Sequence, residues 1–228
     1  MNGVETLFER NPALAQPGGR ADWAESFAPV LTELRVGLRS RTPQEIARRA
    51  GVLWQPEGSA FLLRYLDRSY RLAWPGLIAV EMESGEPCAA ELQALFLYYL
   101  ARATGAPPQE RWVAFRELPD GGFYHKAFQG YTGDLLARAL GNDTEGLRRA
   151  AGALGGQPLD VGDASFRFWG LPRIPLALVY WQGDEEFAPR AQILFDPVAG
   201  DYLPIDGSAA LGSRLVRRLL AQGKGGSA

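Results

Sequence analysis

The stretch from Pro172 to Asp196 constrains the fold of this chain more than any other. Its sequence is PRIPLALVYWQGDEEFAPRAQILFD, in which two apolar runs flank an acidic segment. Apolar runs on either side of a Gly-Asp pair predict two antiparallel strands, over about 174–181 and 191–195, joined by a loop longer than a minimal hairpin. Three consecutive acids are therefore expected at one end of a sheet: Asp184, Glu185 and Glu186.

The rest of the chain mixes helical and strand-like segments. Apolar residues at helical spacing predict helices at about 21–38, 87–104, 131–140, 144–154 and 208–220. Thr42, Pro43 and Glu45 predict the start of a further short helix. A hairpin is predicted at about 60–66 and 70–74, with further strands at about 112–115 and 164–169. Because strands and helices do not alternate regularly, the expected fold class is α+β, with a mainly antiparallel sheet packed against helices.

Length and composition favour one globular domain. With 228 residues, 46% of them hydrophobic, the chain is predicted to form a single α+β domain over 21–222. Residues 1–20 are expected to be a loose leader and 223–228 a disordered tail, because both are rich in turn formers.

Charge and hydropathy restrict the expected partners and location. The formal net charge is -2 with both signs interspersed, so no basic field attracts nucleic acid or an anionic membrane surface. The first residues lack the basic and apolar regions of a secretory signal, and the longest apolar run, near 92–101, is about half the length of a membrane span. We therefore expect a cytoplasmic protein whose unknown partner is a small molecule or a protein, not nucleic acid or membrane.

The acidic loop is the first candidate site. Asp184, Glu186 and Asp196 could converge as oxygen ligands for Mg²⁺ or Ca²⁺, although their spacing matches no calcium-loop pattern. The alternative is a structural turn whose glutamates are solvated or pair with Arg173 or Arg190. Because neighbouring carboxylates repel one another, at least one is expected to have a raised pKa unless a cation or an arginine compensates.

Aromatic and arginine side chains supply further candidates. The central half is rich in aromatics, including Tyr124 and Trp181, which suits a flat cofactor or an aromatic-walled pocket, although most such residues form cores. Arginines among them could clamp a carboxylate or phosphate, or pair ordinarily with Asp163 or Glu117. The predicted ligand-binding residues are Arg116, Tyr124, Asp163, Arg173, Trp181, Asp184, Glu185 and Glu186.

Two other chemistries have weaker support. His125 is the only histidine and Cys88 the only cysteine, and Cys88 is expected inside an apolar helix, so a Cys-His catalytic pair is not favoured over a turn histidine. The DGG and GALGG segments match no phosphate-binding or dinucleotide-binding pattern and are expected to be turns.

Several short motifs give the chain a specific resemblance. They are FRELP at 115–119 with Tyr124 and Phe128 after it, GND at 141–143, Gly162 with Asp163, LPRIP at 171–175, WQGDEEF at 181–187, LFD at 194–196 and YLP at 202–204. Over about 61–220 the chain resembles a prokaryotic family known as domain of unknown function 3786. The resemblance implies a shared fold and assigns no reaction or catalytic residue.

Some members of that family resemble fusions to a four-cysteine iron-sulfur module, which implies an association with anaerobic redox or one-carbon metabolism. Cys88 alone cannot supply the four thiolates of such a cluster, so an iron-sulfur cluster within this chain is not expected and the cofactor is left unknown. The predicted function is a ligand- or cofactor-binding accessory protein with a pocket near the Trp181–Phe187 loop. The alternatives are a carboxylate-based enzyme, with or without a divalent metal, and a protein-interaction module of a metabolic or redox complex.

Overall fold

The computed structural model describes the backbone of residues 23–224 and the side chains of residues 28–223. The chain divides into two compact units. Unit 1 comprises the described residues up to Arg64, with Arg68–Ala106 and Asp201–Gly207. Unit 2 comprises Tyr65–Asp67, Pro107–Gly200 and the described residues from Ser208 onward. The single domain over 21–222 stays a prediction, and the leader expected over 1–20 lies outside the described residues.

Unit 1 combines a four-stranded sheet with helices. Its elements are α2 (Trp23–Arg39), α3 (Pro43–Ala50), β1 (Leu53–Gln55), β2 (Ala60–Tyr65), β3 (Arg68–Ala73), β4 (Ile78–Glu81) and α4 (Ala90–Arg102), and the strand order is β1-β2-β3-β4. The predicted start of α3 is confirmed, because the Thr42 hydroxyl accepts a hydrogen bond from Glu45 N at 3.3 Å. Gly51 ends this helix in the left-handed conformation, at φ 66°.

Helix α4 is the most deeply buried helix segment of unit 1. Nine consecutive residues, from Leu92 to Leu100, are buried, and Phe96 lies 4.9 Å from the Tyr70 ring. The apolar helix predicted at about 87–104 is therefore confirmed as a core element. It begins at Ala90, so the expectation that Cys88 lies inside it is wrong: Cys88 precedes the helix, and its amide donates to Ala79 O.

Unit 2 is built on a five-stranded antiparallel sheet with the order β5-β9-β8-β7-β6. Its strands are β5 (Val113–Ala114), β6 (Gln157–Leu159), β7 (Ala164–Leu171), β8 (Ile174–Trp181) and β9 (Arg190–Phe195). Its helices are η2 (Phe115–Glu117), α5 (His125–Tyr131), α6 (Gly133–Leu140) and α7 (Thr144–Ala153), while α8 (Ala199–Tyr202) and α9 (Ile205–Lys224) connect the units along the chain. The α+β class and the antiparallel pairing are confirmed.

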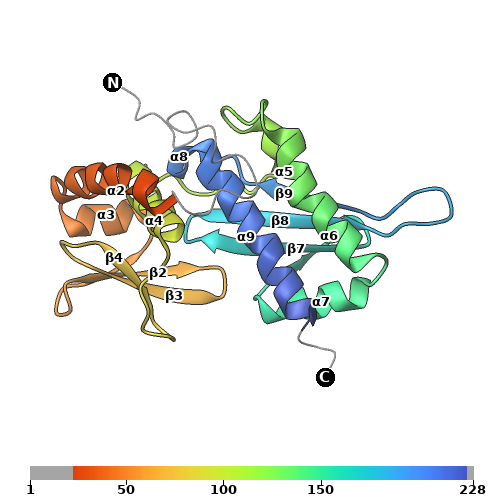
Figure 1. The fold of residues 1–228 in the computed structure, drawn as a ribbon, viewed down its shortest axis with the longest axis horizontal. Coiled ribbons are helices and arrows are strands. Elements are labelled where there is room, and N and C mark those ends of the chain that lie inside the picture. The colour runs from red at the N-terminus through yellow and green to blue at the C-terminus, as the bar shows by residue number, and fades with distance from the viewer. Residues whose placement is uncertain (1–22, 225–228) are drawn as a thin grey trace. The chain divides into compact units, whose positions relative to one another are not determined.

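The helices of unit 2 pack on one face of this sheet, where Figure 1 shows α5, α6 and α9 in front of the strands. Phe128 of α5 stacks on Phe115 at 4.1 Å and lies 5.8 Å from Phe195 of β9. A Cβ atom at Gly212 of α9 would come within 2.7 Å of the Phe128 ring. Glycine therefore permits the close approach of α9 to this aromatic core.

The structure differs from the predicted elements in several places. It adds β1, β4, β6 and α5, and α9 begins before Ser208 and continues through Gly223 and Lys224, the first two residues of the predicted tail. The remainder of that tail, residues 225–228, lies outside the described part. The short strand predicted at 112–115 is only Val113–Ala114, after which η2 begins.

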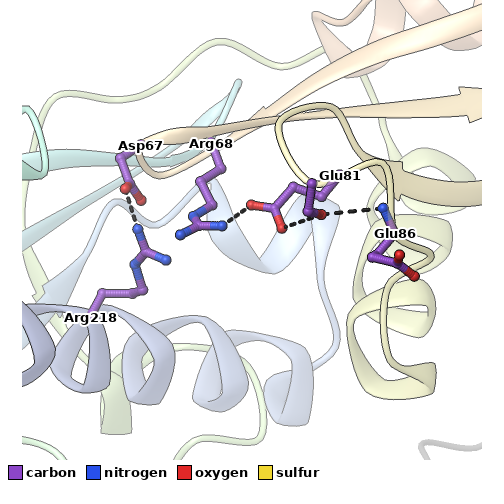
Figure 2. A network of polar contacts seen from close by, with 6 residues as sticks. Asp67, Arg68, Glu81, Glu86 and Arg218 are labelled. Carbon is purple, nitrogen blue, oxygen red and sulfur yellow. Dashed lines mark hydrogen bonds and ion pairs between the residues drawn. The ribbon is translucent and has the colours of Figure 1, made fainter.

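Two ion pairs, each internal to its own unit, are drawn in Figure 2. In unit 1, Arg68 pairs with Glu81 across the β3–β4 ladder. In unit 2, Arg218 of α9 pairs with Asp67. Arg218 is therefore half-buried in an ion pair, whereas Arg217 beside it is exposed.

Candidate functional site

The acidic loop spans residues 182–189, between β8 and β9. Trp181 and Arg190 are paired residues at the ends of the two strands, so the loop is the connection of a hairpin, as predicted. Asp184 closes a turn inside it: its Oδ1 accepts hydrogen bonds from Glu186 N at 2.9 Å and Phe187 N at 2.8 Å, and its amide donates to Phe187 O at 2.9 Å. The Asp184 carboxylate therefore shapes the loop.

These hydrogen bonds also determine the acidity of Asp184. The amides of Phe187 and Glu186 stabilise the charged carboxylate and lower its pKa below the ordinary value of 3.8. Asp184 is therefore not the carboxyl whose raised pKa was expected in this loop.

Asn142, in the turn between α6 and α7, holds the start of the loop. Its Nδ2 donates to Gly183 O at 2.9 Å, and its Oδ1 accepts from Gly183 N at 2.8 Å. The amide side chain thus forms with Gly183 the same pair of hydrogen bonds that a neighbouring backbone would form. A weaker contact joins Gln182 Nε2 to Asn142 O at 3.3 Å.

A second turn supports the loop from the β6–β7 side. Asp163 Oδ2 accepts a hydrogen bond from Gln182 N at 2.7 Å, and Asp163 N donates to Tyr180 O at 2.9 Å. The Tyr180 hydroxyl donates to Gly141 O, and burial raises the pKa of this phenol, so it stays a donor at neutral pH. Three segments distant in sequence, around residues 141, 163 and 183, are thus joined at one end of the sheet.

Between the α6–α7 turn and the loop lies an open hollow of about 330 Å³. It is lined by Gly141, Asn142, Gly183, Asp184, Glu185, Glu186, Phe187, Ala188 and Pro189. Glu185 and Glu186 are exposed, and Phe187 is 69% exposed at the tip of the loop. The hollow therefore offers two solvated carboxylates beside an exposed aromatic ring.

The structure does not bring Asp196 to the acidic loop. Asp196 follows the last residue of β9, at the opposite end of that strand, and is fully buried. Its carboxylate accepts hydrogen bonds from the amides of Gln109, Glu110 and Val198 at 2.8–3.1 Å. The predicted metal ligands Asp184, Glu186 and Asp196 are thus not assembled, and residues 28–223 contain no group of three or more His, Cys, Asp or Glu side chains placed to hold a metal ion.

The two arginines proposed as partners for the acids have other positions. Arg173 lies in the turn between β7 and β8, at the far end of β8 from the loop, so it cannot pair with Glu185 or Glu186. The guanidinium of Arg190 lies 5.7 Å from the centre of the Trp181 ring, as a cation–π contact. This placement fits the alternative in which Glu185 and Glu186 belong to a structural turn and are solvated.

The remaining predicted ligand-binding residues lie outside the hollow. Arg116 is exposed in η2, and Tyr124 is 44% exposed immediately before α5. Glu117, which the sequence analysis considered as an ion-pair partner for the arginines of this region, accepts a hydrogen bond from Ala114 N at 2.7 Å. His125 Nδ1 lies 2.7 Å from Gly122 O, which fits a turn histidine.

Most aromatic residues of the central half belong to the core, as expected for aromatic side chains in general. Phe115, Phe128, Phe166, Phe168 and Tyr180 are buried. Trp169 is an exception, with 39% of its surface exposed.

Asn142 and the backbone of Gly141 are site residues that the prediction missed. The GND motif contributed to the family resemblance, and Asn142 follows the glycine that ends α6, which is a position where a side chain often bonds to backbone. No pattern within the sequence, however, pairs residue 142 with residue 183.

A sequence model described as Domain of unknown function (DUF3786) matches residues 42–218. No curated protein and no solved structure matches the chain. Among the helices of the described residues, none has the length and apolar character needed to cross a membrane.

Proposed function

The chain belongs to the family of the Domain of unknown function (DUF3786), and we propose that it is an accessory binding protein whose hollow at residues 141–142 and 183–189 holds a small organic cation. The observation that carries this proposal is the hollow itself, with the exposed carboxylates of Glu185 and Glu186 in its wall. A ligand with an ammonium or guanidinium group complements two carboxylates, and its apolar part can contact the Phe187 ring.

The hydrogen bonds around the hollow support a preformed site. Asn142 and Asp163 bond the backbone of Gly183 and Gln182, and Asp184 closes the turn from within. A loop that is already ordered loses less conformational entropy when a ligand binds. Four ion pairs lie elsewhere, at Arg49–Glu45, Arg68–Glu81, Arg148–Glu145 and Arg218–Asp67, and none of these four uses Glu185 or Glu186.

A second candidate is a protein-interaction module that uses the same loop. The exposure of Phe187, 69%, and the open form of the hollow favour it, because an exposed aromatic ring at a loop tip is a common contact in protein interfaces. The carboxylate-based enzyme with a divalent metal remains a separate prediction, which the following experiment also examines.

The experiment is thermal unfolding of the full chain with millimolar spermidine, agmatine, MgCl₂, CaCl₂ or MnCl₂, at constant ionic strength. A ligand at about ten times its Kd adds about 1.4 kcal/mol to the free energy of unfolding, which corresponds to a Tm increase of about 3–6 °C. We expect spermidine or agmatine to raise the Tm of the wild type.

A matched pair of variants locates the effect. The double variant Glu185→Gln with Glu186→Gln removes two charges from the hollow, and Glu57→Gln with Glu83→Gln removes two exposed charges from unit 1. The increase should persist in the second and vanish in the first. Equal increases in both variants, or none with either organic cation, would contradict the proposal, and an increase with a divalent metal alone would favour the enzyme alternative.

A further inference from the structure

The four-stranded sheet of unit 1 packs against helices with one face and turns its other face to solvent. Phe61 and Leu63 of β2 are buried, and Tyr70 of β3 lies 4.9 Å from the ring of Phe96 in α4. Because successive side chains of a strand point to opposite faces, the residues between these belong to the second face, which we call the outer face. Its eleven positions are Leu53 and Gln55 of β1, Ala60, Leu62 and Arg64 of β2, Ser69, Arg71 and Ala73 of β3, Ile78 and Val80 of β4, and Met82 directly after β4.

The outer face is accessible in its centre as well as at its edges. At the two edges, Leu53 is 60% exposed, Ile78 is 51% exposed and Met82 is 53% exposed. On the central strands, Leu62 is half-buried, and the exposed residues are Arg64, Ser69 and Arg71. Of the eleven positions only Ala60, at one end of β2, is buried. A partner can therefore reach the full width of this face.

An apolar strip follows β4 on the outer face. Ile78, Val80 and Met82 alternate along the chain, so their side chains succeed one another at intervals of about 6.6 Å. An antiparallel sheet with one solvated face usually places polar residues on that face, whereas all three positions here are apolar. Neighbouring exposed apolar side chains of this kind mark a contact surface for another molecule.

The charged residues of the outer face are two arginines, Arg64 and Arg71. Both are exposed, and Arg71 Nη2 donates a hydrogen bond to Gly58 O at 2.8 Å. The acid of β4, Glu81, points to the opposite face and pairs with Arg68. The outer face therefore carries positive charge beside its apolar strip, and an acidic partner complements it.

The two arginines are close enough to be met from one side of a helix. Trp74 N donates to Ser59 O at 2.7 Å, and this pairing, continued along β2 and β3, makes Arg64 and Arg71 diagonal neighbours, about 7–8 Å apart. Side chains at positions i and i+4 of a helix lie on the same side, with about 5–6 Å between their Cβ atoms. Two carboxylates at that spacing can therefore reach both guanidinium groups together.

We propose that the outer face docks an amphipathic helix of a partner protein, with an apolar stripe over β4 and two carboxylates four residues apart beside the stripe. The strip from Ile78 to Met82 spans about 13 Å, the length of about nine residues of a helix. Arg71 is the direct neighbour of Val80, so the carboxylates lie on the flank of the helix that faces β3. The proposal does not depend on the hollow of unit 2, and each can fail without the other.

Charge also separates this partner from two other occupants. Two copies of the chain packed through the same face would bring the arginines of both copies together, and like charges repel. A membrane-binding cluster typically contains about four to eight basic residues, whereas the outer face carries two, Arg64 and Arg71.

The test is the binding of synthetic helical peptides to the full chain labelled with ¹³C at its methionine methyl groups. The chain has two methionines, Met1 and Met82, so the Met82 signal reports on the outer face. The probe is an alanine-based peptide of about 16 residues with a leucine stripe and two glutamates four residues apart on one flank. One control peptide has lysines in place of the glutamates, and another has the glutamates on the side opposite the stripe. We expect the probe to shift the Met82 signal and to bind at least about five-fold more tightly than either control.

Matched variants locate the charged contact. Arg64→Gln with Arg71→Gln should weaken binding of the probe about five-fold or more. Arg116→Gln with Arg149→Gln removes two exposed arginines of unit 2 and should leave binding unchanged. Equal weakening by the two pairs of substitutions would overturn the proposal.

A second comparison addresses the apolar strip. Ile78→Gln should weaken binding of the probe, whereas Val36→Gln, at a residue of α2 that is 61% exposed, should not. The shift of the Met82 signal in the wild type does not depend on how well any variant folds. No binding of the probe at about 1 mM, equal binding of either control peptide, or an unchanged Met82 signal would overturn the proposal.

Two further outcomes would overturn the proposal in favour of another occupant. A doubled mass of the chain alone in sedimentation, with a concentration-dependent shift of the Met82 signal, would indicate a second copy. A Met82 signal that changes with anionic lipid vesicles and not with the probe would indicate a membrane surface.

Discussion

Asn142 determines the position of the acidic loop, and its replacement gives the sharpest structural prediction. Asn142→Ala removes both hydrogen bonds to Gly183, at 2.8 and 2.9 Å, and leaves the backbone of the loop otherwise unchanged. A typical intramolecular hydrogen bond contributes about 0.5–1.5 kcal/mol to stability, and both of these are exposed, so their loss should cost about 1–2 kcal/mol. For a chain of this length that corresponds to a Tm decrease of about 2–8 °C.

The assay combines urea unfolding with amide NMR spectra of the loop. Gln182→Ala is the matched control, because it removes one exposed amide whose hydrogen bond to Asn142 O is longer, 3.3 Å. It should cost less than about 0.5 kcal/mol. If Asn142→Ala is as stable as the wild type and the Gly183 amide keeps its chemical shift, the side chain does not hold the loop and this reasoning is refuted.

Three further predictions concern the core and the carboxylates. Phe96→Ala in α4 should cost about 3–5 kcal/mol in chemical denaturation, because Phe96 is fully buried, and a cost below about 1 kcal/mol would contradict its core position. Asp196→Ala should lower the free energy of unfolding by at least about 3 kcal/mol, because three backbone amides lose their acceptor. Asp196→Asn retains one carbonyl oxygen and should lower it less; equal decreases in the two variants would show that the negative charge, not the number of acceptors, dominates. The pKa of the Asp184 carboxyl, followed by NMR titration, should lie below 3.8, and a value above 3.8 would refute the hydrogen-bonded turn. Because this pKa is lower in the folded state, the contribution of Asp184 to stability is present above the unfolded pKa and is lost as the pH falls through the folded pKa.

Sequence patterns predicted the elements whose signals are local. The cap of α3 was predictable from Thr42 and Pro43, and β7, β8 and β9 were predictable from apolar runs. The missed β6 is a three-residue edge strand that contains Pro158, and such strands lack a periodic pattern. Helix α5 has no side-chain N-cap and only one buried apolar residue, so tertiary packing rather than its own sequence defines it.

The sequence predicted only one of the two walls of the candidate site. The loop follows from three acids between two strands, whereas its second wall depends on a contact between residues 41 positions apart, Asn142 and Gly183. Asp196 was wrongly grouped with the acidic loop because the two are close in the sequence, whereas in the structure the length of β9 separates them. A strand of six residues spans about 20 Å, which no direct ligation can bridge.

The most direct test of the binding role is native mass spectrometry of the full chain purified from its source organism. We expect an added mass of a small organic cation on the wild type, released by high salt and absent when Glu185 and Glu186 are both replaced by glutamine. A bare wild-type chain, or an added mass that persists unchanged in the double variant, would contradict the assignment of the hollow as the binding site.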